Sequence, residues 1–88
     1  MVFNSAEEAG DDPSQPLADL PPGSVAVVES VDSGAAIGRR LLDLGFTPDT
    51  EIAAVRRAPL GDPTVYELRG FQIALRRSEG RHIWVRPG

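Results

Sequence analysis

The segment "EIAAVRRAPLGDPTVYELRGFQIAL", Glu51 to Leu75, shows how this chain is built. It holds three runs rich in β-branched and aromatic residues, and prolines or glycines separate them. Such runs are typical of short strands joined by tight turns. The predicted strands are 51–58, 64–69 and 71–77.

The corner between the first two strands, "RRAPLGDP", raises three alternatives: a phosphate-binding loop, a metal site or a simple turn. A phosphate loop needs several glycines with free backbone N–H groups, and usually a lysine. This stretch has one glycine, no lysine and two prolines, and Asp62 would repel a phosphate. We therefore interpret it as a turn, in which Pro59 ends one strand and Gly61 lets the chain reverse.

Further strands are predicted on both sides of this segment. "SVAVVESV", 24–31, is rich in β-branched residues, and "HIWVR", 82–86, has the same character. Directly before the last strand, "SEGR", 78–81, is interpreted as one turn. Short strands that follow one another so closely predict an all-β domain with a short helix, folded as a small barrel or curled sheet.

A helix is predicted over 32–45, between the strands 24–31 and 51–58, because the period of the apolar residues changes there. At about 100° per residue, Ile37, Leu41 and Leu44 fall on one face, which we expect to pack on the sheet. Gly45 suits the position just past the end of the helix, where a left-handed conformation is common.

The first sixteen residues differ in composition from the rest of the chain. They contain four of the thirteen acidic residues and no basic one, and after "MVF" their only apolar side chains are alanines. We interpret 1–16 as a disordered acidic tail, because it cannot bury enough apolar surface to offset the loss of chain entropy. The folded domain is then 17–88, in which nine arginines balance nine acids.

This composition excludes several classes of function. A neutral domain lacks the basic surface that nucleic-acid binding needs. The chain has no cysteine, and His82 is its one histidine and lies within a predicted strand. Transition metals favour cysteine and histidine ligands. We therefore expect no enzyme activity, no catalytic residues, no cofactor and no dedicated metal site, with at most weak transition-metal binding.

No apolar run approaches the roughly 20 residues that a membrane helix requires. The start of the chain also lacks the basic and apolar regions of a secretory signal. We therefore expect a cytoplasmic location and no direct membrane insertion.

Four segments in this order, from Leu17 to Val85, resemble a known family. They are "LADLPPG", "GRRLLDLGFTPDTEI", "RRAPLGDP" and "RGFQIALRRSEGRHIWV". Together they are similar to the FeoA family of bacterial ferrous iron transport. The resemblance covers nearly all of the predicted domain.

The resemblance implies an SH3-like barrel with a helical insertion after the first strand. It also implies a small cytoplasmic accessory protein, a non-enzymatic protein-binding module that acts on the FeoB-type membrane transporter with its GTPase domain. The alternative is a transition-metal-binding sensor or regulatory domain, like the C-terminal domain of iron-dependent repressors. No helix-turn-helix precedes the domain here, which favours the first alternative.

One turn departs from the family pattern. The family usually has Leu-Thr-Pro-Gly-Thr where this chain has "FTPDT", 46–50. Aspartate adopts the positive φ of a type II turn less readily than glycine does. A type I turn is therefore expected around Asp49.

The partner-binding site is predicted on the outer face of the helix. Leu42 falls about 100° from Leu41 and so lies away from the packing face, next to Arg39. An apolar residue flanked by arginine is typical of interface centres. The predicted partner-binding residues are Arg39, Arg40, Leu42 and Phe46. The alternative is that Leu42 lies beneath "LADLPPG", or is simply one exposed leucine of a kind common on surfaces.

Overall fold

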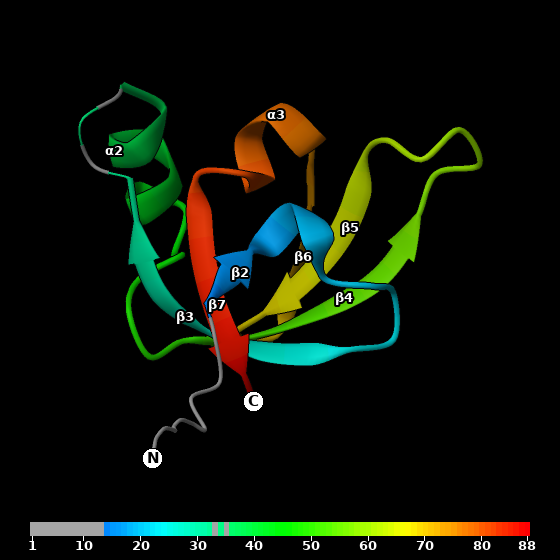
Figure 1. Ribbon diagram of the computed structural model, residues 1–88, viewed down its shortest axis with the longest axis horizontal. Coiled ribbons are helices and arrows are strands. Elements are labelled where there is room, and N and C mark those ends of the chain that lie inside the picture. Colours follow the sequence, from blue (N-terminus) through cyan, green and yellow to red (C-terminus); the bar gives the residue numbers. More distant parts are fainter. Residues whose placement is uncertain (1–13, 33, 35) are drawn as a thin grey trace, which may run out of the picture.

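The computed structural model describes residues 14–32, 34 and 36–88, which form one curled antiparallel sheet (Figure 1). The strands are β2 (Gln15–Pro16), β3 (Val25–Val31), β4 (Glu51–Arg57), β5 (Thr64–Leu68), β6 (Phe71–Leu75) and β7 (Ile83–Pro87). The helices are the 3-10 turn η1 (Leu17–Asp19), α2 (Ala36–Asp43) and α3 (Arg77–Gly80). The order across the sheet is β2-β7-β3-β4-β5-β6, and every neighbouring pair is antiparallel.

The predicted strands are confirmed, with ends that differ by one or two residues. β6 ends at Leu75 rather than at residue 77, because Arg77 begins α3. The predicted helix is shorter than expected and spans Ala36–Asp43. Ser33 and Ala35, which lie within the predicted range, are outside the described residues.

The short strand β2 was not predicted. Gln15 pairs with Val85 and Pro16 pairs with Trp84, while the hydroxyl of Ser14 donates to the carboxylate of Glu29. Of the predicted tail, residues 1–13 lie outside the described residues. A truncation designed to leave the sheet whole should therefore retain Ser14 and everything after it.

Two bulges bend the sheet so that it curls around its own core. The pairing of β3 with β7 shifts register between Val28 and Ser30, and that of β4 with β5 shifts between Ala54 and Arg56. An extra residue on one strand increases the local twist and bends the strand. The inward side chains of distant strands can therefore meet.

The core lies inside this curl and draws on every strand from β3 to β7, together with η1 and α2. Its buried members are Leu17, Leu20, Ala26, Val28, Leu41, Phe46, Ile52, Ala54, Tyr66, Leu68, Leu75, Ile83 and Val85. The hydroxyl of Tyr66 donates to the carbonyl of Leu17 at 3.4 Å, and burial raises the pKa of the phenol above its ordinary value of 10.0. The phenol is therefore uncharged at neutral pH, as its position in the core requires.

The packing face of α2 is confirmed. Leu41 is 0% exposed in the core, and Ile37 and Leu44 pack against the core while remaining partly exposed. Gly45 lies just past the end of the helix, as predicted, and its φ is 112°. The N–H of Gly45 donates to the carbonyl of Leu42, and that of Phe46 donates to the carbonyl of Leu41. This pair of bonds is a Schellman motif, which brings the residue after the glycine back against the helix.

The turn at 47–50 differs from the expected type I turn. The N–H of Thr50 donates to the carbonyl of Thr47 at 3.2 Å, and Asp49 has a φ of 72°. A positive φ at the third position is the mark of a type II turn. The turn is fixed from outside, since the N–H of Asp49 donates to the carbonyl of Val28. The carboxylate of Asp49 also accepts a bond from Arg86 at 3.0 Å.

Substitution of Asp49 should test this conformation. Asp49→Gly should raise the free energy of unfolding, and Asp49→Val should lower it because a β-branched residue fits a positive φ poorly. The two variants should differ in this free energy by about 1–2 kcal/mol. Chemical denaturation measures both values. Arg86→Ala serves as a control, since it removes the ion pair without changing the turn. Equal stabilities of the glycine and valine variants would contradict the type II assignment.

Candidate protein-interaction surface

The helix α2 presents three of the four predicted partner-binding residues to solvent. Arg39 and Arg40 are exposed, and Leu42 is half-buried. Phe46 is 0% exposed, and its prediction as a surface residue is wrong. The Schellman motif explains the difference, because the residue after the helix-ending glycine packs back against the third residue from the end, here Leu41.

Arg40 is committed to a contact within the molecule. Its guanidinium lies 3.1 Å from the carboxylate of Glu79 in α3. The other carboxylate oxygen of Glu79 accepts a bond from the backbone N–H of Arg76 at 2.9 Å, at the start of α3. Arg40 therefore links α2 to α3, and Arg39 is the arginine on this helix that no ion pair of the described residues includes.

Phe71 supplies the exposed aromatic ring that was predicted at Phe46. It is 44% exposed, and its ring lies about 4.0 Å from where a Cβ on Gly45 would lie, at the end of α2. Arg69 and Gly70 have φ values of 50° and 85°, so they form a two-residue hairpin turn immediately before it. Its place beside this turn, at the margin of the sheet, leaves the ring of Phe71 partly open to solvent.

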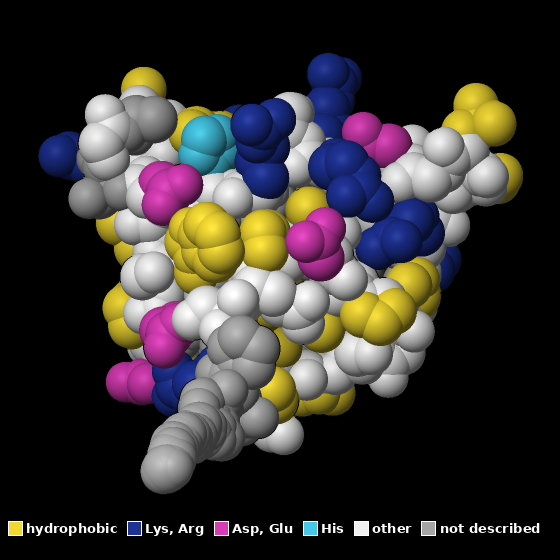
Figure 2. Space-filling view, in the orientation of Figure 1, with side chains coloured by type: hydrophobic (Ala, Val, Ile, Leu, Met, Phe, Trp, Pro, Cys, Tyr) yellow, Lys and Arg dark blue, Asp and Glu magenta, His cyan; other side chains and the backbone are white. Residues whose placement is uncertain are grey.

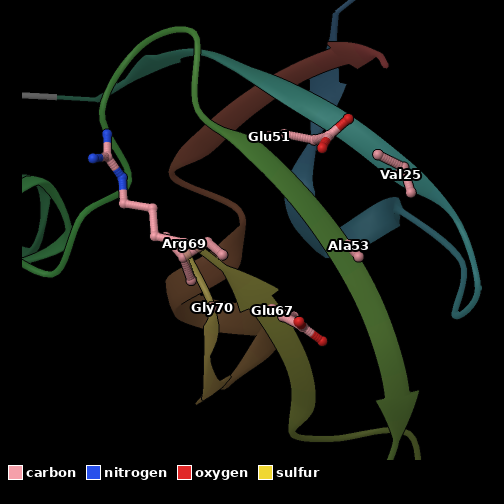
Figure 3. Close-up of a pocket in the computed structure, with 7 residues that line it drawn as sticks. Val25, Glu51, Ala53, Glu67, Arg69 and Gly70 are labelled. Carbon is pink, nitrogen blue, oxygen red and sulfur yellow. The ribbon is translucent and has the colours of Figure 1, made fainter.

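A shallow hollow of about 310 Å³ lies on the outer face of the sheet (Figure 3). The residues that line it are Val25, Glu51, Ala53, Glu67, Leu68, Arg69 and Gly70. Figure 3 shows the two carboxylates on the side of β4 and β5, with the side chain of Arg69 extending away from them. That guanidinium donates to the hydroxyls of Thr47 and Thr50, each at 3.1 Å. Arg69 therefore joins the β5–β6 hairpin to the 47–50 turn.

His82 takes part in a contact between the ends of β3 and β7. Its Nδ1 lies 3.4 Å from a carboxylate oxygen of Asp32, and the indole N–H of Trp84 donates to the other oxygen at 3.1 Å. The backbone N–H of Asp32 donates to the carbonyl of His82 at 2.9 Å. These bonds orient all three side chains along one edge of the sheet.

Two features of the described residues bear on metal binding and on insertion into a membrane. Within 14–32, 34 and 36–88, no three His, Asp or Glu side chains come close enough together to hold a metal ion. In the same part of the chain, no helix has the length and apolar character needed to cross a bilayer.

Comparison with protein families assigns the chain. The model of the FeoA domain matches residues 15–87, which include every strand and helix of the structure. The chain belongs to the FeoA family. The match begins at Gln15 and so includes β2, the strand that the sequence did not predict.

Relatives of known sequence and structure agree with this assignment. The chain is 33% identical over 69 residues to the Fe(2+) transport protein A/Fe(2+) transporter FeoB fusion protein of Porphyromonas gingivalis. The matched region covers 78% of this chain but only 8% of the fusion protein. The FeoA-like protein of Clostridium acetobutylicum superimposes with a TM-score of 0.80 at 31% identity, covering 84% of this chain and 86% of that one.

A second solved structure is FeoA of Stenotrophomonas maltophilia in complex with zinc. It superimposes with a TM-score of 0.71 at 38% identity, covering 78% of this chain and 86% of that one. That protein is described as a prokaryotic SH3 domain protein. The SH3-like fold and the short helix that the resemblance implied are therefore confirmed for this FeoA domain.

Proposed function

We propose that this FeoA domain is a non-enzymatic protein-binding module of ferrous iron transport, which acts on the cytoplasmic side of a FeoB-type membrane transporter. The fusion protein of Porphyromonas gingivalis carries this proposal, since there a FeoA sequence and a FeoB transporter share one chain. Covalent linkage holds two domains at a high effective concentration, so even a weak contact forms. Separate chains need a surface that binds without that help.

The chemistry of the domain supports a role in binding. The imidazole of His82 lies against Asp32, and Tyr66 is buried in the core. A catalytic site requires a nucleophile and a base within hydrogen-bond reach at a cavity. The hollow of Figure 3 presents carboxylates and alkyl groups instead. The surface features that remain are exposed arginines and apolar side chains, which are typical of protein interfaces.

The helix surface gives the first test of the proposal. Leu42→Asp should leave the domain folded, because Leu42 is only half-buried and is not a member of the core. Binding to the purified cytoplasmic part of the transporter should weaken by about 1–3 kcal/mol, the scale of a modest hot spot. Calorimetry measures the affinity, and circular dichroism confirms the fold.

Gln72→Glu is the matched control for this variant. It introduces the same negative charge at an exposed position on β6, outside the helix. A folded Leu42→Asp variant that binds as tightly as the control would exclude α2 from the interface. Failure of the parent protein itself to bind the transporter would contradict the proposed function.

A second candidate function is that of a metal sensor. The observation that favours it is the zinc complex of the Stenotrophomonas maltophilia relative. Titration of this chain with ferrous iron or zinc separates the two candidates. A stoichiometric, tight site would favour the sensor, whereas binding to the transporter in the presence of a chelator would favour the protein-binding module.

A further inference from the structure

The loop between β4 and β5, residues 58–63, holds a leucine almost entirely in solvent. Leu60 is 97% exposed, compared with 46% for Val25 and 44% for Phe71. Single exposed leucines are common on protein surfaces, so exposure by itself indicates nothing. The rigidity of the loop and the charges at its base distinguish this one.

Three hydrogen bonds fix the position of the loop. The N–H of Gly61 donates to the carbonyl of Ala58 at 2.7 Å, and the N–H of Ala58 donates to the carbonyl of Pro63 at 2.9 Å. The carboxylate of Asp62 accepts a bond at 3.0 Å from the backbone N–H of Arg77 in α3. Because the backbone is held in this way, the loop loses little conformational entropy when a partner binds the leucine.

Arginines surround the base of the loop. Arg56 and Arg57 end β4 opposite Val65 and Thr64, and Arg76 follows Leu75, which also pairs with Thr64. Arg57 donates to the hydroxyl of Thr64 at 2.9 Å and to the carbonyl of Leu20 at 3.1 Å. These partners are uncharged.

None of these three arginines takes part in an ion pair among the described residues. The loop also contains a carboxylate, that of Asp62, which accepts a hydrogen bond from the backbone N–H of Arg77 in α3. Figure 2 shows this surface, on which dark blue arginine side chains and a magenta acidic side chain lie between α3 and a protruding apolar corner at the β4–β5 loop. Leu60 therefore lies beside arginines that form no ion pair within the described residues.

The loop is also connected to the helix surface. In Figure 1, α2, α3 and the β4–β5 loop lie along the upper edge of the molecule, with α2 and the loop at its two ends and α3 between them. The ion pair of Arg40 with Glu79 joins α2 to α3, and the bond from Arg77 to Asp62 joins α3 to the loop. These two contacts hold the helix and the loop in fixed positions on either side of α3.

We propose that Leu60 is an anchor that inserts into an apolar pocket, rimmed by carboxylates, on the cytoplasmic part of the FeoB-type transporter. This inference rests on the proposed function and names the contact that would carry it. A binding interface can be built around an aromatic or aliphatic anchor that fills a pocket and is surrounded by a polar rim. The arginines supply the positive half of those pairs, and Leu60 supplies the apolar centre.

The experiment compares four proteins against the purified cytoplasmic part of the transporter: the parent, Leu60→Ala, Leu60→Met and Val25→Ala. Leu60→Ala should raise the Kd about tenfold, the effect of losing a modest hot spot. Leu60→Met should bind nearly as the parent does, since methionine has a similar volume and polarity. Val25→Ala trims a half-exposed aliphatic residue of the outer sheet face and should leave the Kd unchanged. Raising the salt concentration should weaken the parent's binding, because the arginine contacts are screened.

The outcomes separate this inference from the function on which it rests. A parent that does not bind the transporter overturns both. A parent that binds, with Leu60→Ala binding equally well, overturns the anchor alone, as does an equal loss in Val25→Ala. Light scattering tests whether Leu60→Ala changes self-association. If it does while transporter binding stays intact, the anchor is also overturned, because the loop then belongs to a contact between copies of this chain.

Discussion

Replacing Leu41 by alanine should lower the free energy of unfolding by about 2–5 kcal/mol. Leu41 is 0% exposed and lies in the core, where it joins α2 to the sheet. The truncation removes buried methyl groups and leaves a cavity that the surrounding strands cannot fill. Because domains of this kind are stable by only about 5–15 kcal/mol, such a loss should unfold a measurable fraction of the molecules.

Leu42→Ala is the matched control, since it makes the same change one residue along the helix at a half-buried position outside the core. It should cost clearly less than Leu41→Ala in urea denaturation monitored by circular dichroism. If the two variants have equal stability, the packing face of α2 is assigned wrongly. The comparison also keeps stability apart from binding, because the Leu42 position is the one assigned to the partner.

Replacing Phe46 by alanine should cost about 3–5 kcal/mol. The ring is 0% exposed and among the largest fully buried side chains of the domain. Its position is set by the Schellman motif, in which the N–H of Phe46 bonds to the carbonyl of Leu41 and the two side chains pack together. Loss of the ring therefore weakens both the core and the end of the helix.

Phe71→Ala is the matched control for Phe46, because it removes the same ring from a site that is 44% exposed. Thermal unfolding should show a large fall in Tm for Phe46→Ala and a small one for Phe71→Ala. Similar falls in both variants would contradict the burial of Phe46. A folded Phe46→Ala variant of unchanged stability with weakened transporter binding would restore Phe46 to the interface.

The sequence alone determined the elements of this fold. Runs of β-branched residues predicted β3, β4, β5, β6 and β7, and a change of period predicted α2 with its packing face. These features are local, since a strand or a helix face depends on residues that are close in the chain. The glycine at the end of α2 was likewise recognisable, because a left-handed conformation there requires little more than the residue type.

The tertiary structure decided which side chains reach solvent and which turns are strained. Phe46 directly precedes a polar turn in the sequence, yet the chain reversal at Gly45 carries it into the core, while Phe71 remains beside the end of the helix. Asp49 has a positive φ because Val28 on a distant strand holds its backbone N–H, a contact that residue type does not reveal.

The candidate surface divides in the same way. Arg39 and Leu42 could be placed on the outer face of a helix from their spacing alone. The link from Arg40 to Glu79 and the bond from Arg77 to Asp62 join segments far apart in the chain, so only the folded structure lines up α2, α3 and the β4–β5 loop along one edge of the molecule. Residue type sets what a side chain can bind, but long-range packing sets which side chains act together.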